Sequence, residues 1–312
     1  MLRKTLLYLS GQPQVFRFVR NNGLAKGFAS RFVAGETVDE AMGAVRALRK
    51  KKISTSLDLL GESVHTEAEA RASAAAYLGL LDRLAAEGLD VNVSVKLTAM
   101  GLDIAEDLCL QNMHEILSKA REYDGFVRLD MEGSDYTDRT LDLFEQHLYP
   151  SYPQNVGVVL QSMLRRTKDD VARANRLQAR VRICKGAYRE PASVAYPDKA
   201  DVDASYVRAM HSLMTEGNYP GLATHDERII AEAKRFAAAE GIANDRYEFQ
   251  MLYGVRRDLQ EQLVQEGYRL RVYVPFGTQW YPYLMRRLAE RPANLWFITG
   301  SVLKEMTSGR RG

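Results

Sequence analysis

Eight short runs of β-branched and other apolar residues recur along the chain, and this repetition constrains the fold more than any other feature of the sequence. The runs cover residues 53–60, 91–97, 126–131, 156–160, 181–184, 221–224, 247–252 and 270–276. Segments with helical periodicity lie between several of them, at residues 70–87, 167–179, 227–240 and 257–266. A strand followed by a helix, repeated eight times at intervals of about 25 to 40 residues, predicts an α/β fold of the (β/α)8 TIM-barrel type. A doubly wound sheet is the alternative, although its G-x-G-x-x-G turn does not occur in the sequence.

The segments before and after these runs predict helices that flank the barrel. Thr37 and Glu40 form a capping box that opens a helix ending near Lys50. Thr278 can cap a last helix directly after the eighth run, which places that helix over the barrel mouth. We therefore expect an N-terminal helical segment at residues 1–50, a barrel at 51–300 and a C-terminal tail at 301–312.

The composition is that of an ordinary globular protein and argues against several other classes. Of the 312 residues, 46% are hydrophobic and 27% are charged, so a large core can form without disulfides or metals. A net charge of +3 gives no reason to expect a nucleic-acid partner. The two distant cysteines, Cys109 and Cys184, suggest a reducing compartment, and the histidines lack the spacing of a metal site. No apolar run approaches the roughly 20 residues of a membrane span.

The beginning of the chain is basic, because no acidic residue precedes Glu36. Three interpretations stay open at this point: basic helices packed on the barrel, a segment attracted to an anionic membrane surface, or an organellar transit peptide. The first two favour a cytoplasmic protein, with or without peripheral contact at the inner membrane. Mitochondrial targeting is less favoured.

Polar side chains stand where the predicted strands end, which is where (β/α)8 barrels bind their ligands. They are Glu62, Lys96, Asp130, Glu132, Gln161, Arg182, Lys185, His225, Gln250 and Tyr273. A single residue of this kind is often structural. Polar residues at all eight ends predict a large, partly charged ligand, because charges without partners are costly there.

The predicted last helix carries a polar face formed by Tyr283, Arg286, Arg287 and Glu290, at spacing i, i+3, i+4 and i+7. Two adjacent arginines offer forked donors that match a carboxylate or phosphate. The alternative is a solvent-exposed face in which Arg286 pairs with Glu290.

Several of these segments resemble those of the proline dehydrogenases. R-I-C-K-G-A-Y at residues 182–188 resembles the family's R-x-x-K-G-A-Y, and Y-E-F-Q-M-L-Y-G at 247–254 resembles its Y-E-F-Q-x-L-x-G. Y-V-P-F-G at 273–277 and Y-L-M-R-R-L-A-E at 283–290 are similar to Y-x-P-x-G and Y-L-x-R-R-x-x-E. S-V-K-L, D-M-E and A-T-H occur in the expected order, so the resemblance spans residues 53 to 297.

The resemblance implies a (β/α)8 enzyme that uses FAD to oxidise L-proline to Δ1-pyrroline-5-carboxylate, the first step of proline catabolism to glutamate. Arg286 and Arg287 would pair with the substrate carboxylate, and Lys96 would add a charge to it. The catalytic residues it implies are Lys96, Arg182 and Tyr273. The substrate contacts it implies are Lys96, Tyr188, Leu252, Tyr273, Tyr283, Arg286, Arg287 and Glu290.

On the cofactor side, Arg182 matches the family's arginine near flavin N5, the atom that receives the hydride, where a cation stabilises the reduced ring. Gln161 would hydrogen-bond the isoalloxazine, and Glu62 would gate the pocket. The full cofactor-binding set implied by the resemblance is Asp130, Gln161, Arg182, Cys184, Lys185, Gly186, Ala187, Thr224 and His225.

The implied partners are L-proline, a membrane quinone as electron acceptor and a separate enzyme that takes the product, since no aldehyde dehydrogenase half follows in the sequence. Two other functions stay open. Lys96 or Lys185 could form a Schiff base, as in barrel aldolases. A flavin- or anion-binding barrel with an assembly role is the non-enzyme alternative.

Overall fold

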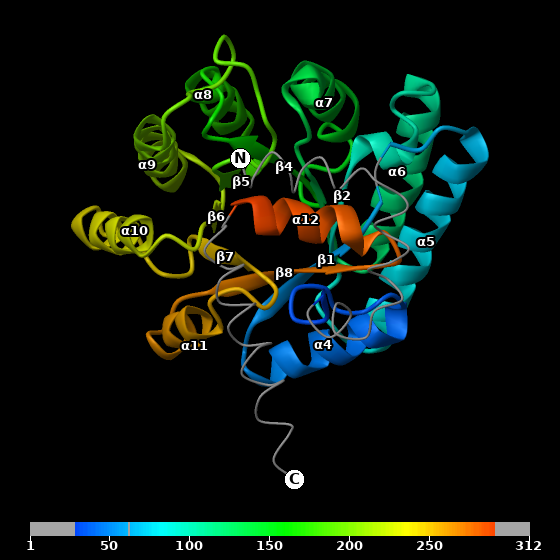
Figure 1. Cartoon of the computed structure of the whole chain (residues 1–312), viewed down its shortest axis with the longest axis horizontal. Coiled ribbons are helices and arrows are strands. Elements are labelled where there is room, and N and C mark those ends of the chain that lie inside the picture. Colours follow the sequence, from blue (N-terminus) through cyan, green and yellow to red (C-terminus); the bar gives the residue numbers. More distant parts are fainter. Residues whose placement is uncertain (1–28, 62, 291–312) are drawn as a thin grey trace, which may run out of the picture.

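The computed structural model describes residues 29–61 and 63–290, with side chains up to Met285. Eight parallel strands pair in sequence order, and β8 pairs with β1 to close the barrel. The strands are β1 Ser54–Leu59, β2 Asn92–Val95, β3 Phe126–Leu129, β4 Val156–Gln161, β5 Arg180–Cys184, β6 Gly221–Ala223, β7 Glu248–Leu252 and β8 Leu270–Phe276. The predicted (β/α)8 barrel is therefore confirmed (Figure 1).

Helices surround the barrel, and the last one crosses its mouth (Figure 1). They are α4 Val38–Lys50, α5 Glu67–Ala86, α6 Glu106–Glu122, α7 Thr137–Leu143, α8 Thr167–Leu177, α9 Lys199–Glu216, α10 Glu227–Ala239, α11 Arg257–Gln265 and α12 Trp280–Glu290. Three of these, α6, α7 and α9, were not specified from the sequence. The predicted capping box of α4 is present, with Thr37 and Glu40 accepting from each other's backbone N–H. The prediction that Thr278 caps the last helix is wrong, because α12 begins at Trp280 and Gln279 is the residue before it.

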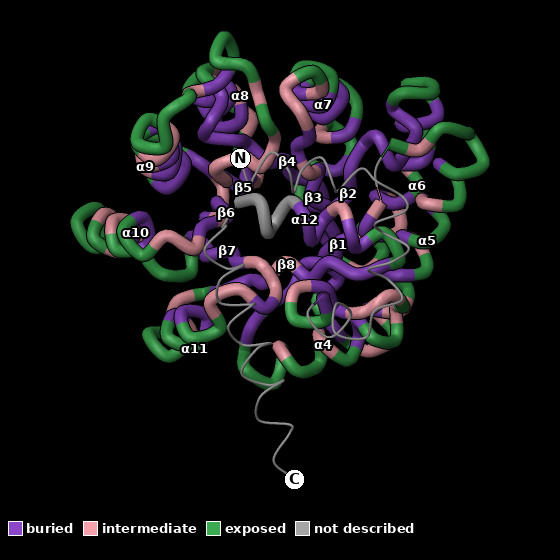
Figure 2. Tube along the Cα trace, viewed as in Figure 1, coloured by how far each residue is buried: buried purple, intermediate pink, exposed green. Residues whose placement is uncertain are grey.

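The hydrophobic core lies between the sheet and the helices. Residues such as Leu57, Val93 and Val127 belong to one buried cluster that also contains helix residues such as Leu81 and Ile116. Figure 2 shows buried residues along the strands and exposed ones on the outer sides of the helices. The apolar runs of the sequence therefore point outward from the barrel, toward the helices.

The opposite face of the strands is polar and points into the barrel lumen. Side chains alternate between the two faces of a strand, so Asp58, Ser94 and Arg128, which are register partners on β1, β2 and β3, share one face. The guanidinium of Arg182 on β5 reaches Ser94 on β2, a strand that does not neighbour it, and only a path through the lumen joins these two. The interior of the barrel is thus lined by hydrogen-bonding and charged groups.

Residues 29–36, which we call the amino-terminal strap, lie against the end of β8 and the start of α12. Ala34 N donates to Pro275 O at 2.8 Å, and Gly277 N donates to Gly35 O at 2.9 Å. The indole N–H of Trp280 donates to Glu36 at 2.9 Å. The strap therefore holds the turn that leads into the helix over the barrel mouth. The division at residues 50 and 300 stays a prediction, as do the membrane and transit-peptide interpretations of residues 1–28, which lie outside the described residues.

Candidate active site

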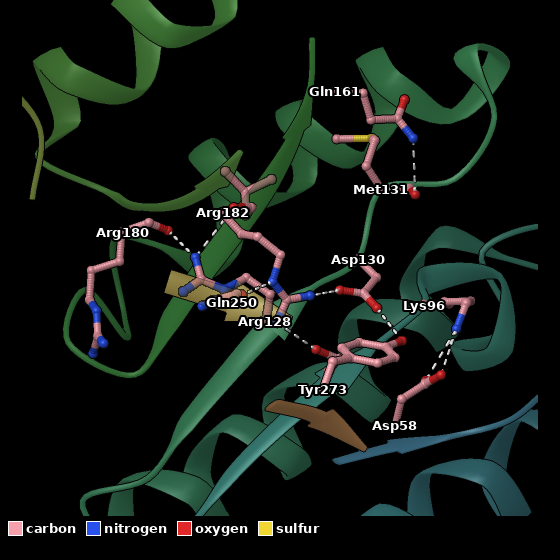
Figure 3. Close-up of polar contacts among 12 residues, drawn as sticks. Asp58, Lys96, Arg128, Asp130, Met131, Gln161, Arg180, Arg182, Gln250 and Tyr273 are labelled. Carbon is pink, nitrogen blue, oxygen red and sulfur yellow. Dashed lines mark hydrogen bonds and ion pairs between the residues drawn. The ribbon is translucent and has the colours of Figure 1, made fainter. Parts of the chain in front are cut away.

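The guanidinium of Arg182, on β5, is the centre of a buried polar cluster in the barrel (Figure 3). Its Nη1 lies 2.7 Å from Asp130 Oδ1, its Nε donates to Gln250 Oε1 at 2.5 Å, and its Nη2 donates to Ser94 Oγ at 3.2 Å. The guanidinium carbon also lies 5.3 Å from the centre of the Tyr273 ring. Partners from four strands or strand ends thus fix both the position and the plane of this cation.

Tyr273, on β8, stands beside this cation with its hydroxyl fixed. The hydroxyl donates to Asp130 Oδ2 at 2.8 Å, so one carboxylate joins the phenol and the guanidinium. Burial, followed by the charges of Asp130 and Asp58, raises the pKa of Tyr273 well above its ordinary value. The phenol therefore stays protonated across the physiological range and acts as a hydrogen-bond donor.

A second ion pair lies next to the first and joins Lys96 to Asp58. Lys96 follows the end of β2, and Asp58 lies within β1. The Lys96 ammonium is 3.1 and 3.3 Å from the two carboxylate oxygens of Asp58 (Figure 3). The side chain of Asp58 is 1% exposed and that of Lys96 is 11% exposed. Burial raises the pKa of Asp58, and the charge of Lys96 opposes that shift. The sequence analysis did not select Asp58; its signal was a lone charge inside an otherwise uncharged strand.

Gln161, at the end of β4, offers an acceptor to a ligand. Its amide N–H group donates to the backbone oxygens of Met131 at 3.4 Å and Glu132 at 3.2 Å. Its amide oxygen is buried and has no hydrogen-bond partner among the described residues. A buried acceptor without a partner is costly, so a ligand N–H at this position would relieve that cost.

The polar cluster continues toward the amino-terminal ends of the strands. Gln250 donates to Glu248 at 2.6 Å, and Glu248 accepts from Arg271 at 2.8 Å, all inside the barrel. Burial favours the neutral form of Glu248, but Arg271 and Gln250 outweigh it and leave its pKa lowered. Asp90 and a strand carbonyl complete the partners of Arg271. A hydrogen-bonded chain thus runs from the far end of the barrel to Arg182. Gln250 was predicted from the sequence, whereas Glu248 and Arg271 were not.

Gly221→Ala is expected to lower the free energy of unfolding by about 1 to 3 kcal/mol, the range for overpacking in a filled interior. An added Cβ would lie 2.4 Å from Gln250 Nε2, and that amide cannot move away without leaving Arg182 or Glu248. Thermal unfolding measures the effect. Gly79→Ala is the matched control, since its Cβ meets nothing within 4 Å and it lies in α5, where alanine is the better helix former. Equal melting temperatures for the two variants would contradict the packing argument.

Comparison with known proteins shows the family to which the chain belongs. The family model described as proline dehydrogenase matches residues 41–299. The chain is 46% identical to "Proline dehydrogenase" of Deinococcus radiodurans over 97% of this chain and 98% of that protein. It is 39% identical to "Proline dehydrogenase 1" of Bacillus subtilis (strain 168) over 98% of this chain and all of that protein. The chain belongs to the proline dehydrogenase family.

A solved structure of similar fold is proline utilization A from Bdellovibrio bacteriovorus, inactivated by N-propargylglycine. It is 28% identical, with a TM-score of 0.81 over 89% of this chain and 34% of that chain. The family resemblance and the prediction of an enzyme are thus confirmed, and the non-enzyme alternative is not favoured. The Schiff-base alternative is also not favoured, since it matches neither the family nor the ion pairs of Lys96 and Lys185.

The proline dehydrogenase motif at residues 182–188 begins in β5 and continues into the loop after it. Lys185 Nζ lies 2.6 Å from Asp203 and 2.9 Å from Asp226, and an ammonium held by two carboxylates is a poor nucleophile. Gly186 has φ +103°, which a side chain would strain, and an added Cβ would lie 2.4 Å from Met163 Sδ, so the Met163 side chain would have to move. Ala187 and the partly buried Tyr188 follow, and Tyr188 packs against a small cluster around Met163.

Other predicted residues lie at the ends of β6 and β7. His225 Nε2 accepts from Leu252 N at 2.9 Å, so this ring nitrogen holds the end of β7. The Thr224 hydroxyl is buried and accepts from Asp226 N at 3.1 Å. Leu252 itself is half-buried at the barrel mouth.

The two cysteines differ in their surroundings. Cys109 is buried in α6, and burial raises its pKa to about 12, which leaves an unreactive thiol. Cys184, at the end of β5, is partly buried and packs against the core. Among residues 29–61 and 63–290, no group of three or more His, Cys, Asp or Glu side chains could hold a metal ion. No helix in that part of the chain is long and apolar enough to span a membrane.

The helix over the barrel mouth contributes the remaining predicted residues. Tyr283 is 6% exposed, and the adjacent Leu284 is also buried. Arg286, Arg287 and Glu290 lie within α12, but their side chains are outside the described part of the structure, and so is Glu62.

Proposed function

We propose that this chain binds FAD over the carboxyl ends of its barrel strands and oxidises L-proline to Δ1-pyrroline-5-carboxylate. The observation that carries the proposal is the fixed guanidinium of Arg182 beside the protonated Tyr273, in a member of the proline dehydrogenase family. Membership in this family supports proline as the substrate, and the buried polar cluster supports hydride transfer to FAD as the reaction. A cation held in a fixed position stabilises the negative charge that develops on a cofactor when it accepts a hydride.

The residues in the barrel mouth fit FAD. The buried oxygen of Gln161 lacks a hydrogen-bond partner among the described residues, and a flavin ring carries an N–H that can supply one. Bound FAD would supply a hydride acceptor at N5. Arg182 and Gln161 would hold the ring with Asp130 behind them, and the loops after β5 and β6 would hold the rest. The residues proposed there are Cys184, Lys185, Gly186, Ala187, Thr224 and His225.

The substrate side is proposed to bind proline through its carboxylate. Lys96 supplies an ammonium at the barrel mouth, and Arg286 and Arg287 on α12 are proposed to add forked donors. Tyr273, Tyr283, Tyr188 and Leu252 are proposed to surround the ring and exclude water, with Glu290 steadying the arginines and Glu62 gating the entrance. Proline must bind with its amine deprotonated, because the nitrogen lone pair assists loss of the hydride from the adjacent ring carbon.

We propose a membrane quinone as the acceptor that reoxidises the enzyme and a separate dehydrogenase as the recipient of the product, in the first step of proline catabolism to glutamate. Such a protein is expected in the cytoplasm, with peripheral contact at the membrane where the quinone resides. The absence of a membrane-spanning helix from the described residues is compatible with this location.

The first test is the visible absorption spectrum of the purified protein before and after anaerobic addition of L-proline. Oxidised-flavin bands that bleach with L-proline and persist with D-proline are expected. A colourless protein that cannot be reconstituted with FAD would contradict the cofactor assignment. A yellow protein that does not bleach with L-proline would contradict the substrate assignment. Borohydride trapping of a carbonyl substrate on Lys96 or Lys185 would instead support the Schiff-base alternative.

A further inference from the structure

We propose that Asp58 is a positioning residue for the oxidation, acting through Lys96 to hold the ammonium charged and directed at the substrate carboxylate. This inference rests on the proposed function. Asp58 is neither one of the polar residues predicted at strand ends nor part of a family motif. It is identified by its ion pair with Lys96 in the barrel lumen.

Asp58 and Lys96 lie at different depths along the barrel axis. Asp58 lies within β1, while Lys96 follows the end of β2, nearer the mouth. The carboxylate is 1% exposed and the lysine side chain is 11% exposed, so a ligand that enters from the mouth meets the ammonium and not the carboxylate. Asp58 therefore acts on the substrate only through Lys96.

The charges of the lumen cluster balance. Two cations, Lys96 and Arg182, face two carboxylates, Asp58 and Asp130, and the Tyr273 hydroxyl interacts with both carboxylates. A buried ammonium that loses its carboxylate pays the full cost of desolvation and tends to lose its proton. Asp58 thus allows a nearly buried lysine to remain a cation at the mouth.

Asp58 also restricts the position of the Lys96 ammonium. Both carboxylate oxygens contact the ammonium, at 3.1 and 3.3 Å, which limits the rotamers that the long lysine side chain can adopt. Asp58 is itself fixed by its strand, between register partners Ser94 on β2 and Pro275 on β8. A charge held in one place binds a carboxylate with less loss of side-chain entropy than a free lysine does.

The test is a double-mutant cycle of Asp58→Asn, Lys96→Met and the double variant, all in the FAD-loaded enzyme. Asp58→Asn is expected to raise the KM for L-proline by about tenfold or more with a smaller change in kcat, as for loss of one partner of a buried charge pair. In the Lys96→Met background, Asp58→Asn should have no further effect on KM, because Asp58 acts on the substrate only through the Lys96 ammonium. Effects that multiply in the double variant, or a lower KM in Asp58→Asn, would overturn the proposal.

A pH profile separates this role from a purely structural one. The charged or titratable groups that face Asp58 are Lys96, Asp130, Tyr273 and Tyr77. Without Asp58, burial lowers the pKa of the Lys96 ammonium, so kcat/KM should begin to fall at a lower pH on the alkaline side than in the unmodified enzyme. Binding of cyclopentanecarboxylate, followed by the change in flavin absorbance, should weaken over the same pH range. An unshifted profile for both would contradict the proposal.

Asp82→Asn is the matched control, since Asp82 pairs with Lys119 on the surface, and it should leave KM and the pH profile unchanged. If Asp58→Asn does not yield folded protein, Asp58→Glu keeps the charge but displaces it, and the same comparison with and without Lys96→Met applies. An unmodified enzyme that neither bleaches nor turns over with proline would refute the proposed function. A working enzyme whose Asp58 variants behave like the control would refute this inference alone.

Discussion

Arg182→Met is expected to lower kcat/KM for L-proline by about a hundredfold to a thousandfold, the usual loss when one fixed donor to developing charge is removed. The change leaves the partly buried Asp130 without its cation and Gln250 without its guanidinium partner. Breaking a buried pair from one side also destabilises the fold by about 3 to 5 kcal/mol. Anaerobic single-turnover reduction by proline measures the chemical step, and thermal unfolding measures the stability.

Two further variants show which property of Arg182 matters. Arg182→Lys keeps a charge but loses the forked donors, so it should recover stability more than rate. Arg71→Met removes an exposed arginine that pairs with Glu67 within α5, and both measurements should stay unchanged. Unaltered flavin reduction in Arg182→Met would refute the assignment of this residue to the reaction.

Arg287→Met is expected to raise the KM for proline by about two orders of magnitude or more while the protein stays yellow. A bidentate arginine–carboxylate pair in a closed site contributes about 2 to 5 kcal/mol to binding, and methionine retains only the apolar stem. Arg287 lies on α12, the helix that crosses the barrel mouth (Figure 1). Steady-state kinetics and the flavin content of the purified variant provide the measurement.

Arg235→Met is the control for Arg287→Met, because it removes an exposed arginine of α10 that pairs with Glu232. Its KM should equal that of the unmodified enzyme. Normal proline affinity in Arg287→Met would show that the substrate carboxylate is bound elsewhere. Loss of flavin from Arg287→Met would instead place this arginine on the cofactor side.

The strands could be predicted from the sequence because each carries apolar residues on the face that packs against helices. The predicted runs were often too long at their carboxyl ends, as in 91–97 against Asn92–Val95. Lys96 and the residues after it leave the sheet for a 3-10 turn, Leu97–Met100, that is just as apolar as the strand. Helices α6 and α7 follow Ala105 and Tyr136, which are not favoured N-cap residues, so the sequence carries no capping signal there. Helix α9 was missed although Asp198, a favoured N-cap residue, precedes it.

The candidate site could be predicted where a polar residue stands at or near the end of a predicted strand. Asp130, Arg182 and Tyr273 were selected on that basis, and the structure brings them together, although Arg182 and Tyr273 lie inside β5 and β8 and not at their ends. Asp58 and Glu248 lie inside strands, where one sequence does not tell which face points into the barrel. The sequence does carry a signal, since charged or polar residues repeat at i and i+2 in β5, β7 and β8, as expected for side chains that face the lumen.

The pairing of β1 with β8 also sets the order in which a newly made chain can mature. These strands pair from Ser54–Arg271 to Leu59–Phe276, so the first strand leaves the ribosome more than 200 residues before its partner. Until then one edge of β1 has no partner, and such edges invite pairing with other chains. The strap must likewise wait for Pro275 and Gly277 before it can dock. The catalytic mouth is therefore completed last, and a protein interrupted during synthesis before β8 cannot acquire activity.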